Sequence, residues 1–256
     1  MQVLSRQLSG VGRNGRALVQ QDALLVATGQ QIAWLQQPSL ALSHDISKTE
    51  PLLLAVADGV SSSPAAATAS RLLLQLLAKN WQAGLLASAT LSSKQLRASQ
   101  QQLTGKLAGK AVSFGASTTI AVLEISAGGF KAINAGDSRI WRYRQGELTQ
   151  LSVDHCFAAE LTHTAEQPLA SCYQALTSYI AADADAEDFV VSVTDGVILP
   201  GDQFLLTTDG IHDVLTPAAL ESCLAVGIEH SDMLDTLLSE TGFDDNASLI
   251  WFSYKP

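Results

Sequence analysis

The sequence predicts an α+β fold in which two stacked antiparallel β-sheets are flanked by helices. Short apolar or β-branched runs bounded by turn residues recur along the chain and are typical of strands. Segments with leucines at helical spacing interrupt these runs in pairs, without the regular strand–helix–strand alternation of a parallel sheet. Hydrophobic residues make up 47% of the 256 residues, which is enough for the large core that such layers require.

The first half of the chain is predicted to contain two strands followed by two helices. The apolar runs 23–27 and 52–57 are consistent with buried strands. A helix is expected over 65–81, because serines and a proline that favour helix initiation precede leucines at helical spacing. A second helix is expected over 92–107, beginning at one of two adjacent serines.

The second half is predicted to hold most of the strands, with two helices before the last one. The expected strands are 118–125, 130–134, 138–144, 147–151, 189–193, 197–199, 203–207 and 247–254. The expected helices are 217–226 and 231–240. Segments 83–93 and 162–171 are expected to be loops, and no linker divides the chain, so residues 1–256 are predicted to form one domain.

The charge balance excludes two classes of partner. Lys and Arg number 15 against 25 Asp and Glu, a net charge of −10, which disfavours binding to nucleic acid or to anionic membranes. Excess acid commonly serves solubility alone. It has a more specific meaning if some of the carboxylates gather around metal ions.

Cysteine content and hydropathy indicate a cytoplasmic protein. Three cysteines do not build a disulfide framework, and none are spaced as in a zinc site. Residues 1–12 lack the apolar segment of a signal peptide, and no apolar run is long enough to span a bilayer.

Five aspartates stand at the ends of predicted apolar strands, each in the context of a tight turn. They are Asp22, Asp58, Asp137, Asp209 and Asp245. Each alone means little, because Asp-Gly is a common turn dipeptide. Together they can hold hard divalent cations such as Mg(II) or Mn(II), which prefer oxygen ligands and, in pairs, activate water and clamp a phosphoryl group.

The triplet Thr-Asp-Gly occurs twice, at 194–196 and at 208–210. The first copy is predicted to be only a turn between two strands. The family resemblance described below implies that Asp209 is the candidate functional residue and that Asp195 is not.

Seven segments, in this order and over nearly the whole chain, resemble the metal-dependent type 2C Ser/Thr protein phosphatases of the compact bacterial type. They are Gly12 to Asp22, LAVADG at 54–59, GASTT at 115–119, AINAGDSR at 132–139, VDH at 153–155, PGD through LLTTDG at 200–210, and DNAS at 245–248. The resemblance implies two stacked antiparallel sheets with helices outside, an α-β-β-α sandwich.

The resemblance implies a centre with two divalent cations, Mn or Mg. Asp58 resembles the carboxylate that bridges both metals, and Gly59 would offer its carbonyl to the second. Asp209 and Asp245 resemble the remaining ligands of the first metal.

Three further positions take roles from the same resemblance. Asp22 resembles an acidic position near the second metal that acts through water, and Asp137 resembles a ligand of a weaker third metal, shared with Asp209. Arg16 is the candidate for binding the substrate phosphate, because a guanidinium fits phosphate; its spacing to Asp22 is one residue longer than usual, so Arg13 is an alternative.

The activity implied is hydrolysis of phosphoserine and phosphothreonine by in-line attack of a metal-bridging hydroxide, with Asp58, Asp209 and Arg16 carrying the catalysis. The implied partners are phosphorylated Ser/Thr proteins and a Ser/Thr kinase that the enzyme opposes in signalling. The alternative is a weak or inactive phosphatase-like scaffold that binds a kinase or a phosphoprotein. Loss of metal carboxylates would mark such a scaffold, and Asp58, Asp209 and Asp245 are all present.

Two departures from the family pattern affect the expected site. Gln21 stands where the family has an acidic residue, which removes one carboxylate near the second metal. Val60 follows the Asp-Gly pair where a histidine sometimes occurs, and valine cannot act as a general acid. Residues 156–172 stand where the family has a flap beside the active site; the flap is short here and is expected to influence substrate choice.

Overall fold

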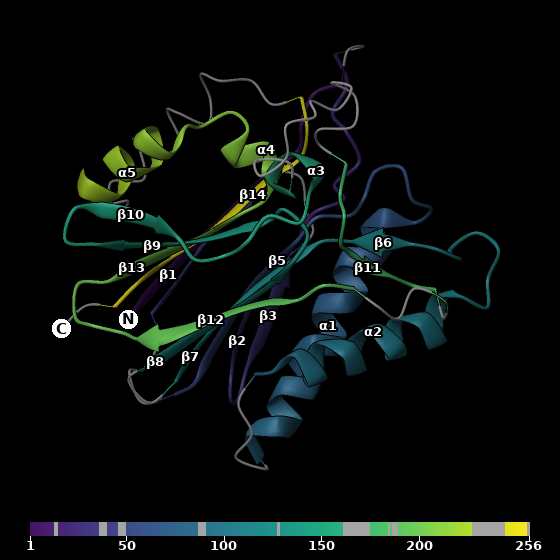
Figure 1. The fold of residues 1–256 in the computed structure, drawn as a ribbon, viewed down its shortest axis with the longest axis horizontal. Helices are drawn as coiled ribbons and strands as arrows, with labels where there is room; N and C mark the ends of the chain where they lie inside the picture. Colours follow the sequence, from purple (N-terminus) through teal and green to yellow (C-terminus); the bar gives the residue numbers. More distant parts are fainter. Residues whose placement is uncertain are drawn as a thin grey trace.

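The computed structural model describes residues 1–12, 15–35, 40–45, 50–86, 91–126, 129–160, 175–183, 185, 189–226 and 244–254. Two six-stranded antiparallel sheets lie face to face at its centre, with helices on the outer face of each (Figure 1). The predicted fold class, an α-β-β-α sandwich, is confirmed. None of the described helices has the length and apolarity that a membrane span requires.

The first sheet has the strand order β10-β9-β13-β14-β1-β4. Its strands are β1 (Gln2–Leu8), β4 (Leu40–Asp45), β9 (Arg139–Arg144), β10 (Glu147–Gln150), β13 (Gln203–Thr207) and β14 (Ala247–Ser253). Strands β1 and β14, from opposite ends of the chain, pair along their whole length from Gln2 opposite Ser253 to Leu8 opposite Ala247.

The second sheet has the strand order β12-β8-β7-β5-β2-β3. Its strands are β2 (Ala23–Thr28), β3 (Ile32–Leu35), β5 (Leu52–Ala57), β7 (Ile120–Ser126), β8 (Gly129–Ala135) and β12 (Ser192–Val197). A separate two-stranded ribbon joins β6 (Ser117–Thr118) to β11 (Ile180–Ala181).

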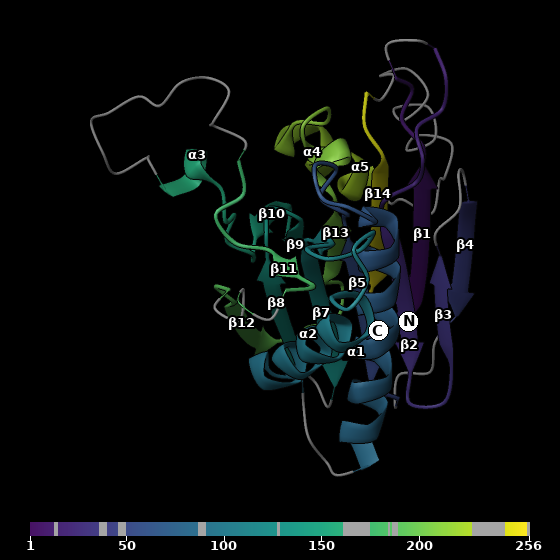
Figure 2. The same cartoon turned by 90° about the vertical axis from the view of Figure 1, so that its right-hand side faces the viewer.

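Helices α1 (Ala66–Leu86) and α2 (Ser93–Leu107) cover the second sheet, and α5 (Pro217–Val226) covers the first (Figures 1 and 2). Short helices α3 (Phe157–Glu160) and α4 (Asp209–His212) lie in connections. Strand β5 is buried at every position, because one face contacts the other sheet and the other contacts α1. This double burial explains why β5 is an unbroken apolar run in the sequence.

The structure corrects the prediction for residues 189–199. Two short strands with a turn at 194–196 were expected there, but β12 runs through that triplet and pairs with β8 from Ser192 to Val197. Gly196 does not form a turn: it lies over the ring of Phe130, which a Cβ atom at this position would approach to 2.9 Å.

Several boundaries also differ from the predicted ones. Helix α1 continues to Leu86, into the segment expected to be a loop. Strands β1, β3 and β4 were not predicted. The helix expected over 231–240 and the loop expected over 162–171 lie outside the described residues.

The register of both sheets brings five chain segments to one end of the sandwich. In the second sheet, Ala23 at the start of β2 lies opposite Ala57 at the end of β5. In the first sheet, Thr207 at the end of β13 lies opposite Leu249 near the start of β14 and Arg139 at the start of β9. The five candidate aspartates lie within two residues of strand ends, and Asp22 and Asp58 lie directly beside them.

Candidate active site

A cavity of about 600 Å³ opens at this end of the sandwich, and four of the five predicted aspartates line it. They are Asp58, Asp137, Asp209 and Asp245. Gly59 and both positions that depart from the family pattern, Gln21 and Val60, line it as well. Residues far apart in the sequence therefore converge in the way that the sequence motifs predicted.

The polypeptide around Asp58 is held from two sides. The Thr119 backbone amide donates to the Asp58 carbonyl at 2.8 Å, and the Asp58 amide donates to Thr119 Oγ1 at 3.1 Å. Gly59 is required at the next position, because a Cβ atom there would lie 2.6 Å from the Ala66 carbonyl oxygen. These contacts fix the direction in which the Asp58 side chain leaves strand β5.

Asp209 and Asp245 are neighbours because β13 and β14 pair beside them. Asp209 begins helix α4, and its Oδ1 accepts the Gly210 amide at 2.7 Å. Asp245 Oδ1 accepts the Asn246 amide at 2.7 Å. Each carboxylate is thus oriented by the backbone of the following residue, and its second oxygen has no hydrogen bond of this kind to restrain it.

Asp22 lies beneath the cavity and is fully buried. Thr208 Oγ1 donates to its Oδ2 at 2.9 Å, across 186 residues of sequence. Its Oδ1 has no hydrogen-bond partner. Asp22 also interacts with Asp58, which places it behind the cavity floor.

Asp137 occupies the turn between β8 and β9, which neighbouring side chains hold in place. Asn134 Nδ2 donates to the Gly136 carbonyl at 3.3 Å, and His155 Nδ1 accepts the Gly136 amide at 3.1 Å. His155 Nε2 contacts Ser192 Oγ at 2.9 Å. His155 therefore supports the backbone beside Asp137.

The carboxylates raise one another's pKa values. The pKa of Asp22 rises from 3.8 to about 7, chiefly through burial and further through the charge of Asp209. Burial and the charges of Asp22 and Asp209 also raise the pKa of Asp58 well above its usual range. Burial, with the charge of Asp245, raises the pKa of Asp209 to about 6. Burial, with the charge of Asp209, raises that of Asp137 to about 7.

This donor set fits a hard divalent cation. Carboxylate and carbonyl oxygens are the ligands that Mg(II) and Mn(II) prefer, and Asp22 Oδ1 has an unmet hydrogen-bonding capacity. None of the described residues that line the cavity is Lys or Arg, so no side chain there neutralises the acids.

Side chains alone do not complete such a centre. Among the described residues, no three His, Cys, Asp or Glu side chains by themselves form a group that could hold a metal ion. A cation in the cavity would therefore need backbone oxygens, such as the Gly59 carbonyl, and water among its ligands.

Comparison with known proteins decides the family. The family model described as "Protein phosphatase 2C" matches residues 39–238, more than three quarters of the chain. The chain belongs to the protein phosphatase 2C family. It is accordingly a protein serine/threonine phosphatase, of a metal-dependent family.

Solved structures share the fold of this phosphatase at low sequence identity. The Mycobacterium tuberculosis serine/threonine phosphatase PstP/Ppp is 19% identical, with a TM-score of 0.71 over 99% of this chain and all of that one. Stp1 from Staphylococcus aureus is 16% identical, with a TM-score of 0.73 over 98% of this chain and 95% of that one. The PstP catalytic domain in complex with two manganese ions is 20% identical, with a TM-score of 0.65 over 98% of both chains. No curated protein matches the sequence.

Arg16 of the phosphatase stands on a turn beside the carboxylates rather than in the cavity wall. It is exposed, and its carbonyl accepts the Gly12 amide at 2.9 Å. The turn touches the cavity at its base, where Gly10 packs against the backbone of Asp245 without room for a Cβ atom. Arg13, the alternative phosphate-binding residue, lies outside the described residues.

The sequence analysis missed one acidic residue near the cavity. Asp213, exposed just after α4, raises the pKa values of Asp137 and Asp209 through its charge. Its own pKa is raised, chiefly by partial desolvation of the carboxylate, while nearby Arg139 lowers it. Helical spacing was the signal available, because residues 209 and 213 are four apart and lie on one side of a helix.

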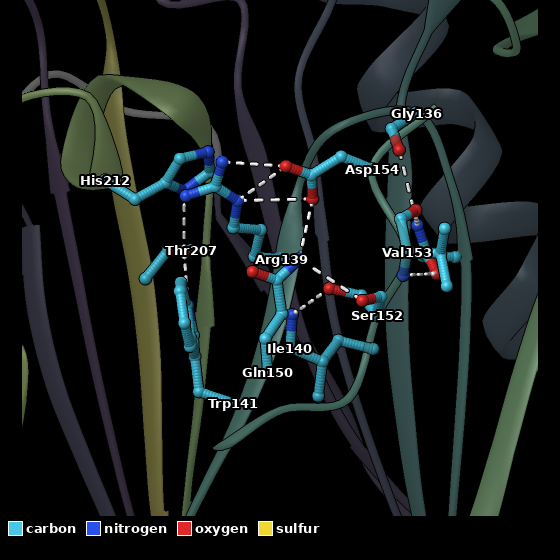
Figure 3. A network of polar contacts seen from close by, with 11 residues as sticks. Gly136, Arg139, Ile140, Trp141, Gln150, Ser152, Val153, Asp154, Thr207 and His212 are labelled. Atoms are coloured by element: carbon cyan, nitrogen blue, oxygen red, sulfur yellow. Dashed lines mark hydrogen bonds and ion pairs between the residues drawn. The ribbon is translucent and has the colours of Figure 1, made fainter. Parts of the chain in front are cut away.

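A network of polar side chains joins β9, the end of β13, α4 and the segment that follows β10 (Figure 3). Arg139 forms a two-pronged ion pair with Asp154, at 3.0 and 2.7 Å. Buried His212, next to Arg139, contacts Thr207 Oγ1 at 2.9 Å. Burial, with the charge of Arg139, lowers the pKa of His212 to about 3, so the imidazole stays neutral.

Proposed function

We propose that this chain hydrolyses phosphoserine and phosphothreonine monoesters in proteins, in a reaction that needs two divalent cations, Mn(II) or Mg(II). The observation that carries the proposal is the convergence of Asp58, Asp137, Asp209 and Asp245 in one cavity. Bound divalent cations would lower the pKa of water and neutralise the charge of the phosphoryl group.

The residues of the chain have separate tasks in this proposal. Asp58, Asp209 and Asp245 would hold the cations, with the Gly59 carbonyl, while Asp22 would act on the second cation through water. Asp137 and Asp209 would share a weaker third cation, for which Asp213 adds negative charge. Arg16 would bind the substrate phosphate, and its position on a turn that packs against Asp245 supports this role.

The geometry favours direct, in-line attack by water on phosphorus without a covalent phosphoenzyme. No His or Cys occurs among the described residues that line the cavity, so its serine and threonine hydroxyls have no imidazole base there. Val60 lines the cavity and cannot donate a proton, so water would protonate the leaving oxygen.

We further propose that residues 1–256 act as one catalytic domain, since strands from both ends of the chain pair in the first sheet. That the enzyme opposes a Ser/Thr kinase and acts in the cytoplasm stays a prediction from the sequence.

Purified protein tests the activity directly. We expect turnover of p-nitrophenyl phosphate and of a phosphothreonine peptide with added Mn(II), and its complete loss in EDTA. Arg16→Gln should raise KM for the peptide more than it lowers kcat. Turnover that persists in EDTA would refute the metal mechanism, and binding of the phosphopeptide without turnover would favour the scaffold alternative.

A further inference from the structure

The charges of this protein are separated between its layers. From Gly59 to Leu123 the sequence contains no Asp or Glu at all, although Asp and Glu number 25 in the whole chain. Six cations occur in that stretch: Arg71, Lys79, Lys94, Arg97, Lys106 and Lys110. The rest of the chain holds the other nine cations and every acid, a net charge of −16. A positive layer therefore covers an otherwise strongly negative molecule.

This stretch forms the helical layer over the second sheet (Figures 1 and 2). Helices α1 and α2 are held side by side by Asn80, whose Nδ2 donates to Ser99 Oγ at 2.9 Å and to Gln102 Oε1 at 3.4 Å. Their leucines are buried against the sheet, and all six cations are exposed. The outward surface therefore presents ammonium, guanidinium and glutamine amide groups without a carboxylate of its own.

At one edge of this layer, side chains of α2 contact another segment of the same chain. Arg97 lies 4.7 Å from the Phe189 ring centroid and donates to the Phe189 carbonyl at 3.2 Å. Gln100 Nε2 donates to the Asp183 carbonyl at 3.4 Å. The α2 edge with Arg97 and Gln100 thus contacts Phe189 and Asp183 of the same chain.

At the opposite edge the cations have no acidic residue near them in sequence, because neither α1 nor α2 contains Asp or Glu. We call Arg71, Lys79, Lys106 and Lys110 the cationic face. On α1, Arg71 and Lys79 are eight residues apart on the outward side, and Lys106 lies on the side of α2 that faces α1, four residues after Gln102. Like charges without opposite partners do not stabilise a helix, so helix stability does not explain this composition.

We propose that the cationic face docks an acidic segment of the phosphoprotein substrate, close in sequence to the phosphorylated residue. The positive charge of this face favours an acidic partner. Because α1 begins at the cavity wall, a partner bound there would also reach the cavity, as a substrate does. The cavity wall includes Ser61, Ser62, Ser63 and Pro64, which lead directly into α1. Docking of an acidic segment does not depend on the proposed phosphatase function. Only the statement that this segment belongs to a substrate rests on it.

Dimensions set the size of the segment. At 1.5 Å per residue, Arg71 lies about 8 Å and Lys79 about 20 Å along the axis of α1 from its first residue. An extended peptide advances about 3.3 Å per residue, so an acidic tract starting about three residues from the phosphorylated residue can reach both.

The remaining charge of the molecule disfavours long polyanions. A nucleic acid or an anionic bilayer extends beyond the cationic face and meets the rest of the molecule, whose sequence carries a net charge of −16. A short acidic peptide avoids that repulsion.

The test measures binding first, without catalysis. A fluorescently labelled, unphosphorylated Glu-rich peptide of about twelve residues, which would span both helices, is titrated with the protein, beside a Gln-rich peptide of the same length. We expect binding of the Glu-rich peptide alone, weakened by salt. Lys79→Gln with Lys106→Gln should weaken it about three- to tenfold, the range for two exposed charge contacts.

A matched control lies on the same helix. Lys94→Gln removes the same charge from the first turn of α2, outside the cationic face, and we expect less than about a twofold change. Equal losses in Lys94→Gln and Lys106→Gln would show a nonspecific charge effect and overturn the proposal. Absence of peptide binding, preferential binding to phosphatidylserine vesicles or duplex DNA, or a salt-sensitive dimer that the double variant dissociates would each overturn it too.

Activity then tests the link to substrate. Phosphothreonine peptides with a Glu-rich or a Gln-rich tail should differ about three- to tenfold in kcat/KM, and Lys79→Gln with Lys106→Gln should abolish the difference through KM. Peptide binding in a protein without turnover would uphold the cationic face while refuting the proposed activity. Turnover without a preference between the Glu-rich and Gln-rich tails would support the proposed activity and overturn the docking role of the cationic face.

Discussion

The two ends of strand β13 carry aspartates in opposite surroundings. At one end, buried Asp202 receives two hydrogen bonds from Arg144, both at 2.6 Å, and one from the Leu199 amide at 2.7 Å. At the other end, burial and the charge of Asp245 raise the pKa of Asp209 to about 6, although a hydrogen bond with Asp58 lowers it. The partner of each carboxylate, rather than its place at a strand end, separates a structural ion pair from a cation site.

The largest effect is expected from a substitution in the cation site itself. Asp58→Asn should lower kcat/KM about a hundredfold or more, because an amide neither neutralises a cation nor bridges two of them as a carboxylate does. Asp195→Asn is the matched control from the second Thr-Asp-Gly triplet, and its activity should stay within about twofold. Circular dichroism checks that both variants fold. Comparable losses in the two variants would contradict the assignment of the site.

Thermal unfolding with and without Mn(II) measures how much cation binding at the same site stabilises the folded protein. Saturation to about a hundred times Kd contributes about 2.7 kcal/mol, or roughly 5–10 °C in a domain of this size. The Asp58→Asn variant should lose most of this shift. An equal shift in wild type and variant would place the cation elsewhere on the protein.

Asp202→Asn should act on stability without changing the cation site. The substitution leaves Arg144 without its anionic partner and should cost about 2–3 kcal/mol, because the carboxylate is buried although the guanidinium is partly exposed. Urea unfolding measures this change, and titration with Mn(II) should give an unaltered Kd. A weaker Kd would show that the two ends of β13 are not independent.

The last test concerns pH in metal-free protein. The folded pKa values of Asp22 and Asp137, about 7, exceed the ordinary 3.8, so the folded state binds more protons between these values. Stability should therefore decrease as pH rises from about 4 to about 7. His212 acts in the opposite direction, since its pKa falls from 6.5 to about 3 and its unfolded form gains the proton on acidification. Urea unfolding in EDTA at several pH values measures the difference, and saturating Mn(II) should remove the loss near neutral pH.

The sequence located the aspartates of the cavity because each stands beside a strong strand or turn signal. Strand β1 shows what local signals miss. Its Ser5 and Gln7 are polar yet fully buried, and Gln7 Nε2 reaches the Asp22 carbonyl at 3.2 Å and Ser248 Oγ at 3.1 Å. Contacts across 15 and 241 residues explain this burial, and no local pattern contains them.

The same reason accounts for the error at residues 194–196. Asp-Gly predicts a turn by local preference, but pairing with β8 and the ring of Phe130 keep the chain extended there. The orientation of Asp22 likewise depends on Thr208, which the sequence alone does not place beside it. Motif order identifies which residues meet, and tertiary contacts decide how they are oriented.

The tight packing of glycines beside the carboxylates limits how this enzyme can change. Gly59 lies against the Ala66 backbone and Gly210 against the Asn246 backbone, with no space for even a methyl group. Substitution at either position would displace the backbone beside Asp58 or Asp209, so neither offers a gradual route to altered activity. Variation among descendants or designed variants is therefore confined to the rim, at positions such as Gln21 and Val60. New substrate preferences would arise at these rim positions, while the packing of the glycines beside the carboxylates stays the same.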